Sequence, residues 1–205
     1  MEELISAIQD KYSFTLPDVY RILVERGHTN HANEDMYLWL PETRWLSLER
    51  ILEHEPADYH QDDFVPFAKN PAGDYWMWRP DATRDGRVPV VFCPHDDELG
   101  EFDSPDITGF LYRRVLLYAL SEYEDAGDAE ARAQMREFAS VLQSILPPAW
   151  IERIVDIAGR PAVAYNQKTI FAEEVIGLLT EDQLDAIVEE DLKFADLGVE
   201  FKWMK

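Results

Sequence analysis

The sequence predicts an α+β fold, in which a mainly antiparallel sheet is covered by helices and followed by a mostly helical C-terminal extension. Three observations carry this prediction. Residues 73–78 and 88–93 are strand-like apolar runs, and residues 80–86 between them are rich in turn residues, an order typical of a β-hairpin. Elsewhere, apolar residues recur mainly at helical spacing. We therefore expect the hairpin to form the centre of the sheet.

The first strand of this hairpin is apolar on both faces. Successive side chains of a strand point to opposite faces, so Trp76 and Trp78 share one face with Asp74, while Tyr75 and Met77 occupy the other. This pattern indicates a central strand. The two tryptophans are expected in the core, with a ligand platform as the alternative. Asp74 is expected to accept hydrogen bonds from the adjacent turn, because a buried carboxylate without partners is costly.

The segment before the hairpin is expected to contribute helices and two further strands. Helical spacing of apolar residues predicts three short helices, over residues 4–12, 17–26 and 47–55. Pro17 suits the first turn of the second helix, because its missing N–H would be unpaired there, and Gly27 suits the end of that helix. Two apolar runs predict strands over residues 36–40 and 64–68. Pro66 argues that the latter is an edge or a strand start.

The chain after the hairpin is first acidic and then helical. Residues 95–103 contain five carboxylates next to His95. Ser104 and Pro105 are expected to cap and open the next helix, because serine accepts backbone hydrogen bonds and proline fits the first turn. This helix completes a domain that we expect over residues 1–124.

Residues 125–205 are expected to form the helical extension. Apolar spacing predicts three helices there. The last of them begins with Thr180 and Gln183, which fit a capping box that satisfies two backbone donors. Residues 199–203 alternate apolar with polar side chains. That alternation predicts either a half-buried strand or an adhesive tail.

The net charge of −22, from 41 acidic and 19 basic residues, restricts the possible partners. A field of this sign repels phosphate backbones and anionic membrane surfaces, so neither nucleic acid nor a membrane is expected as a partner. The same field would speed association with a basic protein. The alternative is that acidity only aids solubility.

The cysteine content and the apolar runs indicate a cytoplasmic location. Cys93 is the single cysteine, so an intramolecular disulfide is impossible and a secreted, disulfide-rich protein is not indicated. No apolar run approaches the roughly 18 residues of a membrane span, and Met1-Glu2-Glu3 is unlike the start of a signal peptide.

Catalytic and metal sites are not indicated by the residues. The best metal candidate is the run His95-Asp96-Asp97-Glu98, but three consecutive acids cannot all face one ion on a regular strand, so a solvated acidic loop is preferred. His28 and His31 could ligate a metal only if their loop were helical, and no partner acid lies at a fixed spacing. Neither a Gly-x-Ser-x-Gly elbow nor a Gly-rich phosphate loop occurs. The acidic run after Cys93 argues against a reactive thiolate. We therefore expect no catalytic, metal-binding or cofactor-binding residue.

Five short motifs in order resemble the SUKH superfamily, which is named for a yeast cell-wall-synthesis regulator and contains many bacterial immunity proteins. The resemblance covers roughly the first 120 residues, and the order and spacing of the motifs carry it. The motifs are Leu16-Pro17-x-x-Tyr20, Val65-Pro66-Phe67-Ala68, Gly73-Asp74-Tyr75-Trp76, Pro89-Val90-Val91-Phe92, and Ser104 leading to Phe110-Leu111. The chain departs from the family at Arg26-Gly27, where Asn-Gly is common, and in the few glycines before Asp74.

This resemblance implies an α+β fold, a twisted sheet with helices packed on it, and no catalytic activity. Bacterial members typically neutralise a toxin of their own genome, often a nuclease or deaminase. An acidic inhibitor suits such a target, because proteins that act on nucleic acid are usually basic. The expected contact surface is the acidic run and the neighbouring sheet edge, with these partner-binding residues: Asp96, Asp97, Glu98, Glu101 and Asp103.

Two other functions stay open at this point. The first is a regulatory or scaffold protein that self-associates, for example as a homodimer, through residues 199–203 of the C-terminal extension. The second is a metal-dependent hydrolase, which would carry stoichiometric metal.

Overall fold

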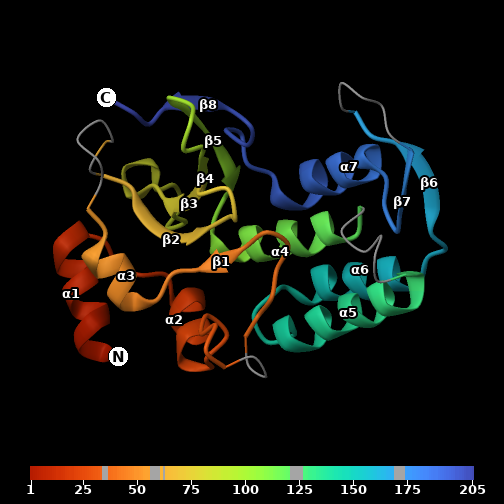
Figure 1. The fold of residues 1–205 in the computed structure, drawn as a ribbon, viewed down its shortest axis with the longest axis horizontal. Coiled ribbons are helices and arrows are strands. Elements are labelled where there is room, and N and C mark those ends of the chain that lie inside the picture. The colour runs from red at the N-terminus through yellow and green to blue at the C-terminus, as the bar shows by residue number, and fades with distance from the viewer. Residues whose placement is uncertain (34–36, 56–60, 62, 121–126, 169–173) are drawn as a thin grey trace. The chain divides into compact units, whose positions relative to one another are not determined.

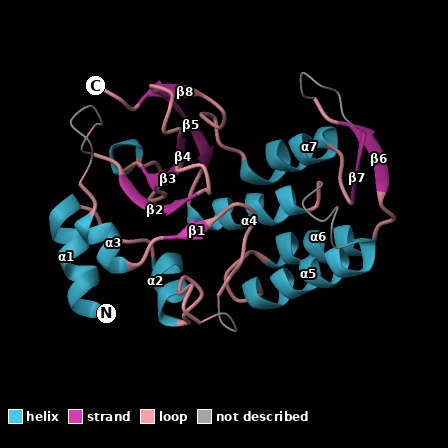
Figure 2. Cartoon of the chain, viewed as in Figure 1, coloured by secondary structure: helices cyan, strands magenta, loops and turns pink. Residues whose placement is uncertain are grey.

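Helices and an antiparallel sheet confirm the predicted α+β fold (Figure 2). The structure, a computed structural model, describes residues 1–33, 37–55, 61, 63–120, 127–168 and 174–205. The chain divides into two compact units, one made of Met1–Phe110 and Phe194–Lys205 and the other of Leu111–Lys193. The domain boundary expected near residue 125 lies outside the described residues. The last twelve residues belong to the first unit, so the end of the chain is part of the sheet domain.

The first unit is built on a six-stranded antiparallel sheet in the order β1-β2-β3-β4-β5-β8 (Figure 1). Its strands are β1 (Arg44–Trp45), β2 (Val65–Lys69), β3 (Tyr75–Trp78), β4 (Val90–Cys93), β5 (Leu99–Ser104) and β8 (Glu200–Lys202). Its helices are α1 (Glu2–Tyr12), α2 (Asp18–Glu25), α3 (Leu48–Glu53) and the short 3₁₀ helix η1 (Pro80–Ala82). The hairpin predicted from the sequence is β3–β4, with Trp76 opposite Phe92 and Met77 opposite Val91. It lies at the centre of the sheet, as expected.

One face of the sheet carries an aromatic core. Trp76 and Trp78 are 2% and 0% exposed, which confirms that they are interior residues and not a ligand platform. The ring of Tyr20, from α2, lies 4.8 Å from that of Trp78 at an interplanar angle of 81°. Phe67 lies 4.5 Å from Trp78, and Phe110 lies 5.8 Å from Trp76. Such edge-on and tilted ring pairs add about 0.5–1.5 kcal/mol each beyond their burial.

The other face is covered in part by the end of the chain. Met77 and Val91 of the hairpin pack in one buried cluster with Phe102 of β5 and Trp203. β8 pairs with β5, with Gly100 opposite Phe201. Of the alternating residues 199–203, Glu200–Lys202 form strand β8, one of the two alternatives expected from the sequence, and Trp203, which follows the strand, is 1% exposed.

The two strands predicted before the hairpin differ in outcome. Met36 lies outside the described residues, and the remainder of the expected strand over residues 36–40 is irregular apart from a single bridge between Leu40 and Thr43. The second expectation is met in one of its two forms: Pro66 is the second residue of β2, as a strand start requires, whereas β2 is not an edge strand, since it lies between β1 and β3. Pro66 is tolerated there because β1 pairs only with the far end of β2 and the ladder to β3 shifts register just after the proline.

The helix after β5 begins later than the sequence suggested. Ser104 is the last residue of β5, and α4 spans Ile107–Tyr118. The capping role falls to Asp106, whose Oδ1 accepts a hydrogen bond of 2.9 Å from the backbone N–H of Gly109. The strand β5 continues through Ser104, so the helix begins after this serine and Asp106 takes the capping position.

The second unit contains the remainder of α4, three further helices and a small sheet. Its elements are α5 (Gly127–Leu142), α6 (Pro148–Gly159), α7 (Glu181–Leu192), β6 (Val163–Asn166) and β7 (Glu174–Gly177). The capping box of Thr180 and Gln183 at the start of α7 is present with both hydrogen bonds, as predicted. The antiparallel β6–β7 pair was not predicted. None of the helices described is long and apolar enough to cross a membrane.

Candidate functional site

The expected acidic loop is the turn between β4 and β5. Asp96, Asp97 and Glu98 are exposed in this turn, and Glu101 is exposed on the strand that follows. We refer to these four residues as the acidic surface. They lie within a span of six residues, so the surface concentrates negative charge on one end of the β4–β5 pair.

The end of the chain holds the acidic surface in place. The Trp203 indole Nε1–H donates a hydrogen bond of 2.8 Å to the Asp97 carbonyl, and the Trp203 backbone N–H donates one of 3.0 Å to the Glu98 carbonyl. The Asp97 carboxylate accepts a hydrogen bond of 2.9 Å from the Leu99 N–H. Lys202 Nζ lies 3.0 Å from Glu98 Oε2, in a pair exposed on both sides. These hydrogen bonds connect the backbone of the turn to a buried indole.

Asp103 was expected to belong to the contact surface, and the structure contradicts this. This residue is only 3% exposed, whereas Glu101 is exposed two positions earlier. The two side chains share a strand face, but β5 runs into the interior, so the face is solvated at one end and covered at the other. A carboxylate buried in this way cannot form part of an exposed binding surface.

A carboxylate–imidazole pair lies beside the acidic surface. Asp74 Oδ1 accepts a hydrogen bond of 2.9 Å from the His95 backbone N–H and lies 2.6 Å from His95 Nδ1. Asp74 Oδ2 accepts one of 2.7 Å from the Asn70 side-chain amide. The hydrogen bond from Asn70 in the β2–β3 turn confirms that Asp74 accepts from the adjacent turn.

The electrostatics of this pair favour its charged form. Burial raises the pKa of Asp74, but the hydrogen bonds from His95 and Asn70 outweigh burial, so the pKa of this carboxyl lies below its usual value. The hydrogen bond to Asp74 raises the pKa of His95, and the charge of Asp96 acts in the same direction. Each partner therefore stabilises the ionised state of the other.

Potential metal ligands come together in a different set from the consecutive run in the sequence. One ligand atom each from Asp74, His95 and Asp96 lies within 4.8 Å of the other two, and among the described residues no other such group of three is found. Asp97 and Glu98 are instead engaged with Leu99 and Lys202, respectively.

Sequence reasoning missed Asp74 as a member of this set. The register of the β3–β4 hairpin indicates this grouping, because Tyr75 lies opposite Cys93. Asp74, the residue before Tyr75, is therefore brought close to the residues that follow Cys93.

The two histidines near the N-terminus could share an ion only if their loop were helical. His31 Nε2 lies 2.9 Å from the Trp45 carbonyl oxygen, and its ring lies 4.3 Å from that of Tyr37. His28 and His31 are in a turn that is not helical. The condition under which they could share an ion is therefore not met.

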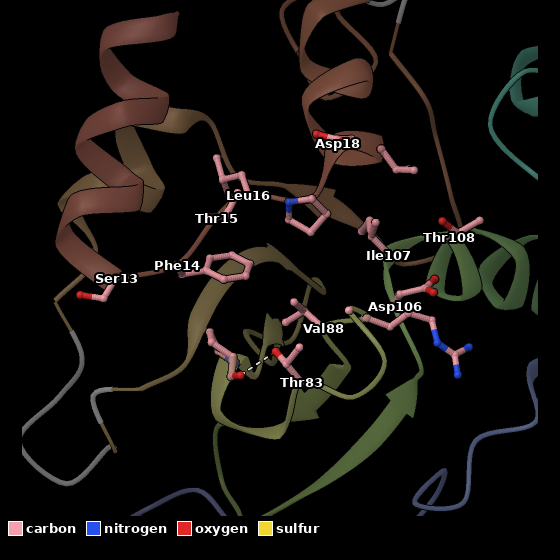
Figure 3. Close-up of a pocket in the computed structure, with 15 residues that line it drawn as sticks. Ser13, Phe14, Thr15, Leu16, Asp18, Thr83, Val88, Asp106, Ile107 and Thr108 are labelled. Atoms are coloured by element: carbon pink, nitrogen blue, oxygen red, sulfur yellow. Dashed lines mark hydrogen bonds between the residues drawn. The ribbon is translucent and has the colours of Figure 1, made fainter.

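A groove of about 530 Å³ lies near the other end of β4, between the α1–α2 connection and the β3–β4 loop (Figure 3). Phe14, Leu16 and Val88 contribute apolar surface to it. Asp18 and Asp106 lie at its margin (Figure 3). Its lining comes from separate segments of the chain, and no local sequence pattern marks it. The residues that line it include hydroxyl and carboxyl groups but neither histidine nor cysteine, so no imidazole stands ready to activate a hydroxyl nucleophile.

Cys93 is also unsuited to nucleophilic chemistry. Its side chain is 0% exposed, and burial raises the pKa of the thiol well above its usual value. A thiol that stays protonated and covered cannot attack a substrate.

Comparisons of the chain with protein-family models, with curated proteins and with solved structures find no match. The resemblance to the SUKH superfamily therefore stays a prediction from the order of the motifs, and function has to be argued from the site itself.

Proposed function

We propose that the chain is a non-enzymatic protein-binding module of the immunity type, which neutralises a basic toxin domain of the nuclease or deaminase type. The observation that carries the proposal is the acidic surface: three exposed carboxylates on a turn that Trp203 holds in place, and a fourth on the strand that follows. A cytoplasmic location and a bacterial source accompany this proposal.

The order of the turn supports binding by this surface. Association costs less when loops do not have to be ordered at the interface. Here the backbone carbonyls of Asp97 and Glu98 are bonded to Trp203, which is 1% exposed and belongs to the core. The carboxylates are thus displayed from a fixed backbone.

The charge of the chain supports a basic partner. With 41 acidic and 19 basic residues, the molecule attracts cationic proteins at long range, and the acidic surface gives that attraction a defined contact area. Complementary charge mainly raises the association rate, by factors that fall steeply with salt. A toxin that binds nucleic acid has the basic surface that fits.

A growth-rescue experiment tests the proposal directly. A toxin-like reading frame from the neighbourhood of the gene is expressed with and without the chain, and rescue of growth together with a stable 1:1 complex is expected. Toxicity that persists while both proteins are folded and abundant would argue against the immunity function.

The contribution of the acidic surface is measured by association kinetics. Replacing Asp97, Glu98 and Glu101 by lysine is expected to slow association with the basic toxin roughly tenfold or more at low salt. The matched control replaces three exposed acids of the second unit by lysine: Glu137, Glu152 and Glu189. Both triple variants change the net charge equally. If association is slowed equally in both, the effect comes from net charge, and the turn is not the contact surface.

Self-association through the C-terminal segment is the alternative function. In the structure this segment pairs with β5, and Gln61 bonds to the carbonyl oxygens of Lys202 and Trp203. Val199, 49% exposed, is the hydrophobic side chain of the segment that remains at the surface. Val199→Asp therefore tests self-association without removing core residues. A dimer in sedimentation that this variant dissociates would support the alternative.

A further inference from the structure

The group formed by Asp74, His95 and Asp96 joins two turns that are distant in the sequence. Asp74 lies between β2 and β3, and His95 and Asp96 follow β4. Their ligand atoms, one from each residue, lie within 4.8 Å of one another. His95 is exposed and Asp74 is mostly covered, so the group lies at the surface with one side held by the protein.

We propose that Asp74, His95 and Asp96 form a binding site for a divalent transition-metal ion such as Zn²⁺, with water completing the coordination. This proposal does not rest on the proposed function, since it concerns the ion alone.

The donor set decides the class of ion. One imidazole with two carboxylates favours Zn²⁺, Co²⁺ or Mn²⁺ over Mg²⁺ and Ca²⁺, which prefer oxygen donors alone. Zinc bonds to nitrogen and oxygen are about 2.0–2.2 Å, which places neighbouring donors roughly 3–3.6 Å apart. The Asp74–His95 distance of 2.6 Å has to widen slightly, because the ion replaces the shared proton. The Asp96 ligand atom lies within 4.8 Å of the other two, and the exposed side chain has to bring it to the ion.

The surroundings of Asp74 hold the site in position. The side-chain amide of Asn70 donates a hydrogen bond of 2.7 Å to Asp74 Oδ2. The same asparagine accepts hydrogen bonds from the backbone N–H groups of Gly73 and Asp74. The His95 backbone N–H donates to Asp74 Oδ1. Partners that orient a ligating carboxylate in this way are typical of metal sites, and their loss typically lowers affinity about 10–100-fold.

Binding exchanges protons for the ion. The imidazolium of His95 loses one proton when its nitrogen coordinates the metal, and that proton passes to the buffer. Calorimetry in buffers of different ionisation enthalpy measures this proton release.

Metal titration of the full chain tests the site. Zn²⁺ is titrated calorimetrically near pH 7, and Co²⁺ is followed by its visible absorption. We expect one saturable site, with affinity lowered roughly tenfold or more by His95→Ala and by Asp96→Asn. The matched control is Glu101→Gln, which removes the same charge from the acidic surface outside the group and is expected to change affinity less than about twofold.

Two outcomes would overturn the proposal. One is the absence of saturable binding of Zn²⁺, Co²⁺ and Mn²⁺ up to millimolar concentration. The other is an equal loss of affinity in Glu101→Gln and Asp96→Asn, which would indicate diffuse attraction of cations to an acidic surface. If His95→Ala disturbs the turn, the site is tested in the wild-type protein instead. Zinc is added and the NMR signals of the His95 imidazole are followed. Unchanged imidazole signals count against the site.

The metal test and the toxin test are independent in outcome. If the protein rescues growth from the toxin but binds no metal, only the proposed ion site is refuted. Metal binding without rescue would refute the immunity function alone.

Discussion

The guanidinium carbon of Arg79 lies 4.5 Å from the centre of the Phe201 ring. Arg79 follows β3 of the central hairpin, and Phe201 is in the C-terminal strand, so a cation–π contact joins two segments more than one hundred residues apart. The same guanidinium lies 5.3 Å from the Phe102 ring and 5.7 Å from the Phe64 ring. The end of the chain is thus an integral part of the first unit.

Replacing Arg79 by methionine is expected to destabilise the protein by about 1–2 kcal/mol in urea unfolding, because the charge over three rings is lost while most of the aliphatic stem is kept. Arg84→Met is the control, since Arg84 is 58% exposed and paired with Asp196 at the surface, where such pairs contribute about 0–1 kcal/mol. An Arg79 variant as stable as the Arg84 variant would contradict the cation–π role.

Trp203→Ala is expected to lower the free energy of unfolding by about 3–5 kcal/mol, because the indole is 1% exposed and fills the cluster beneath the hairpin. It should also loosen the acidic turn, seen as faster amide exchange at Leu99, whose N–H bonds to Asp97. The control is Lys202→Ala at the preceding residue, an exposed position where a change within about 0.5 kcal/mol is expected. A mild effect of Trp203→Ala would mean that the C-terminal strand is dispensable.

Gly177→Ala is expected to be strongly destabilising, by about 1–3 kcal/mol or more. A Cβ at Gly177 would collide with the backbone carbonyl oxygens of Leu120 and Leu179, neither of which can move without shifting the chain. Gly159→Ala is the matched control. Nothing lies within 4 Å of the added carbon there, and alanine is a better helix former than glycine. Thermal unfolding should separate the two variants clearly, and equal melting temperatures would exclude the close approach at Gly177.

Cys93 is expected to resist thiol reagents in the native protein. Its side chain is 0% exposed, and burial raises the pKa of the thiol, so almost no thiolate is available. Labelling with a disulfide reagent near pH 8 should be slow without denaturant and complete in urea. Rapid labelling of the native protein would show that this end of β4 opens readily.

Tyr12 is expected to make stability depend on alkaline pH. Burial raises the pKa of its phenol to about 12 from the ordinary 10. Between these values the unfolded chain loses the proton and the native chain keeps it, so this contribution is complete below pH 10 and is lost as pH rises toward 12.

The measurement compares the wild type with Tyr12→Phe by urea unfolding at two pH values. Near pH 8 the variant should be less stable by about 0.5–1.5 kcal/mol, because the phenol donates a hydrogen bond of 3.1 Å to the Ile51 carbonyl. Near pH 11 the difference should shrink. A difference that grows instead would contradict the sign of the pKa shift.

Much of the fold could be predicted because its signals are local. The apolar runs on either side of a turn-rich loop predict the β3–β4 hairpin, and helical spacing locates most of the helices. The capping box at Thr180 follows from hydrogen bonds that close within three residues. The short β6–β7 pair escaped prediction because its strands have only four residues each and lack a strong alternating pattern.

The candidate site could be predicted only in part. The exposed acids at positions 96–98 and 101 follow from charge and turn position, whereas the burial of Asp103 depends on what covers the inner end of β5. The pairing of Asp74 with His95 depends on the register of the hairpin. The groove beside Phe14 depends on three segments meeting in space.

The sequence by itself determined the class of fold, the central hairpin and the excess of negative charge, because periodicity, turn chemistry and composition act over a few residues or over the whole chain. The tertiary structure alone decided that the last residues return to pair with β5, that Trp203 fixes the acidic turn, and that Asp74 meets His95 and Asp96. These relationships join segments far apart in the chain. Burial and long-range pairing select them, and no short stretch of sequence contains both partners.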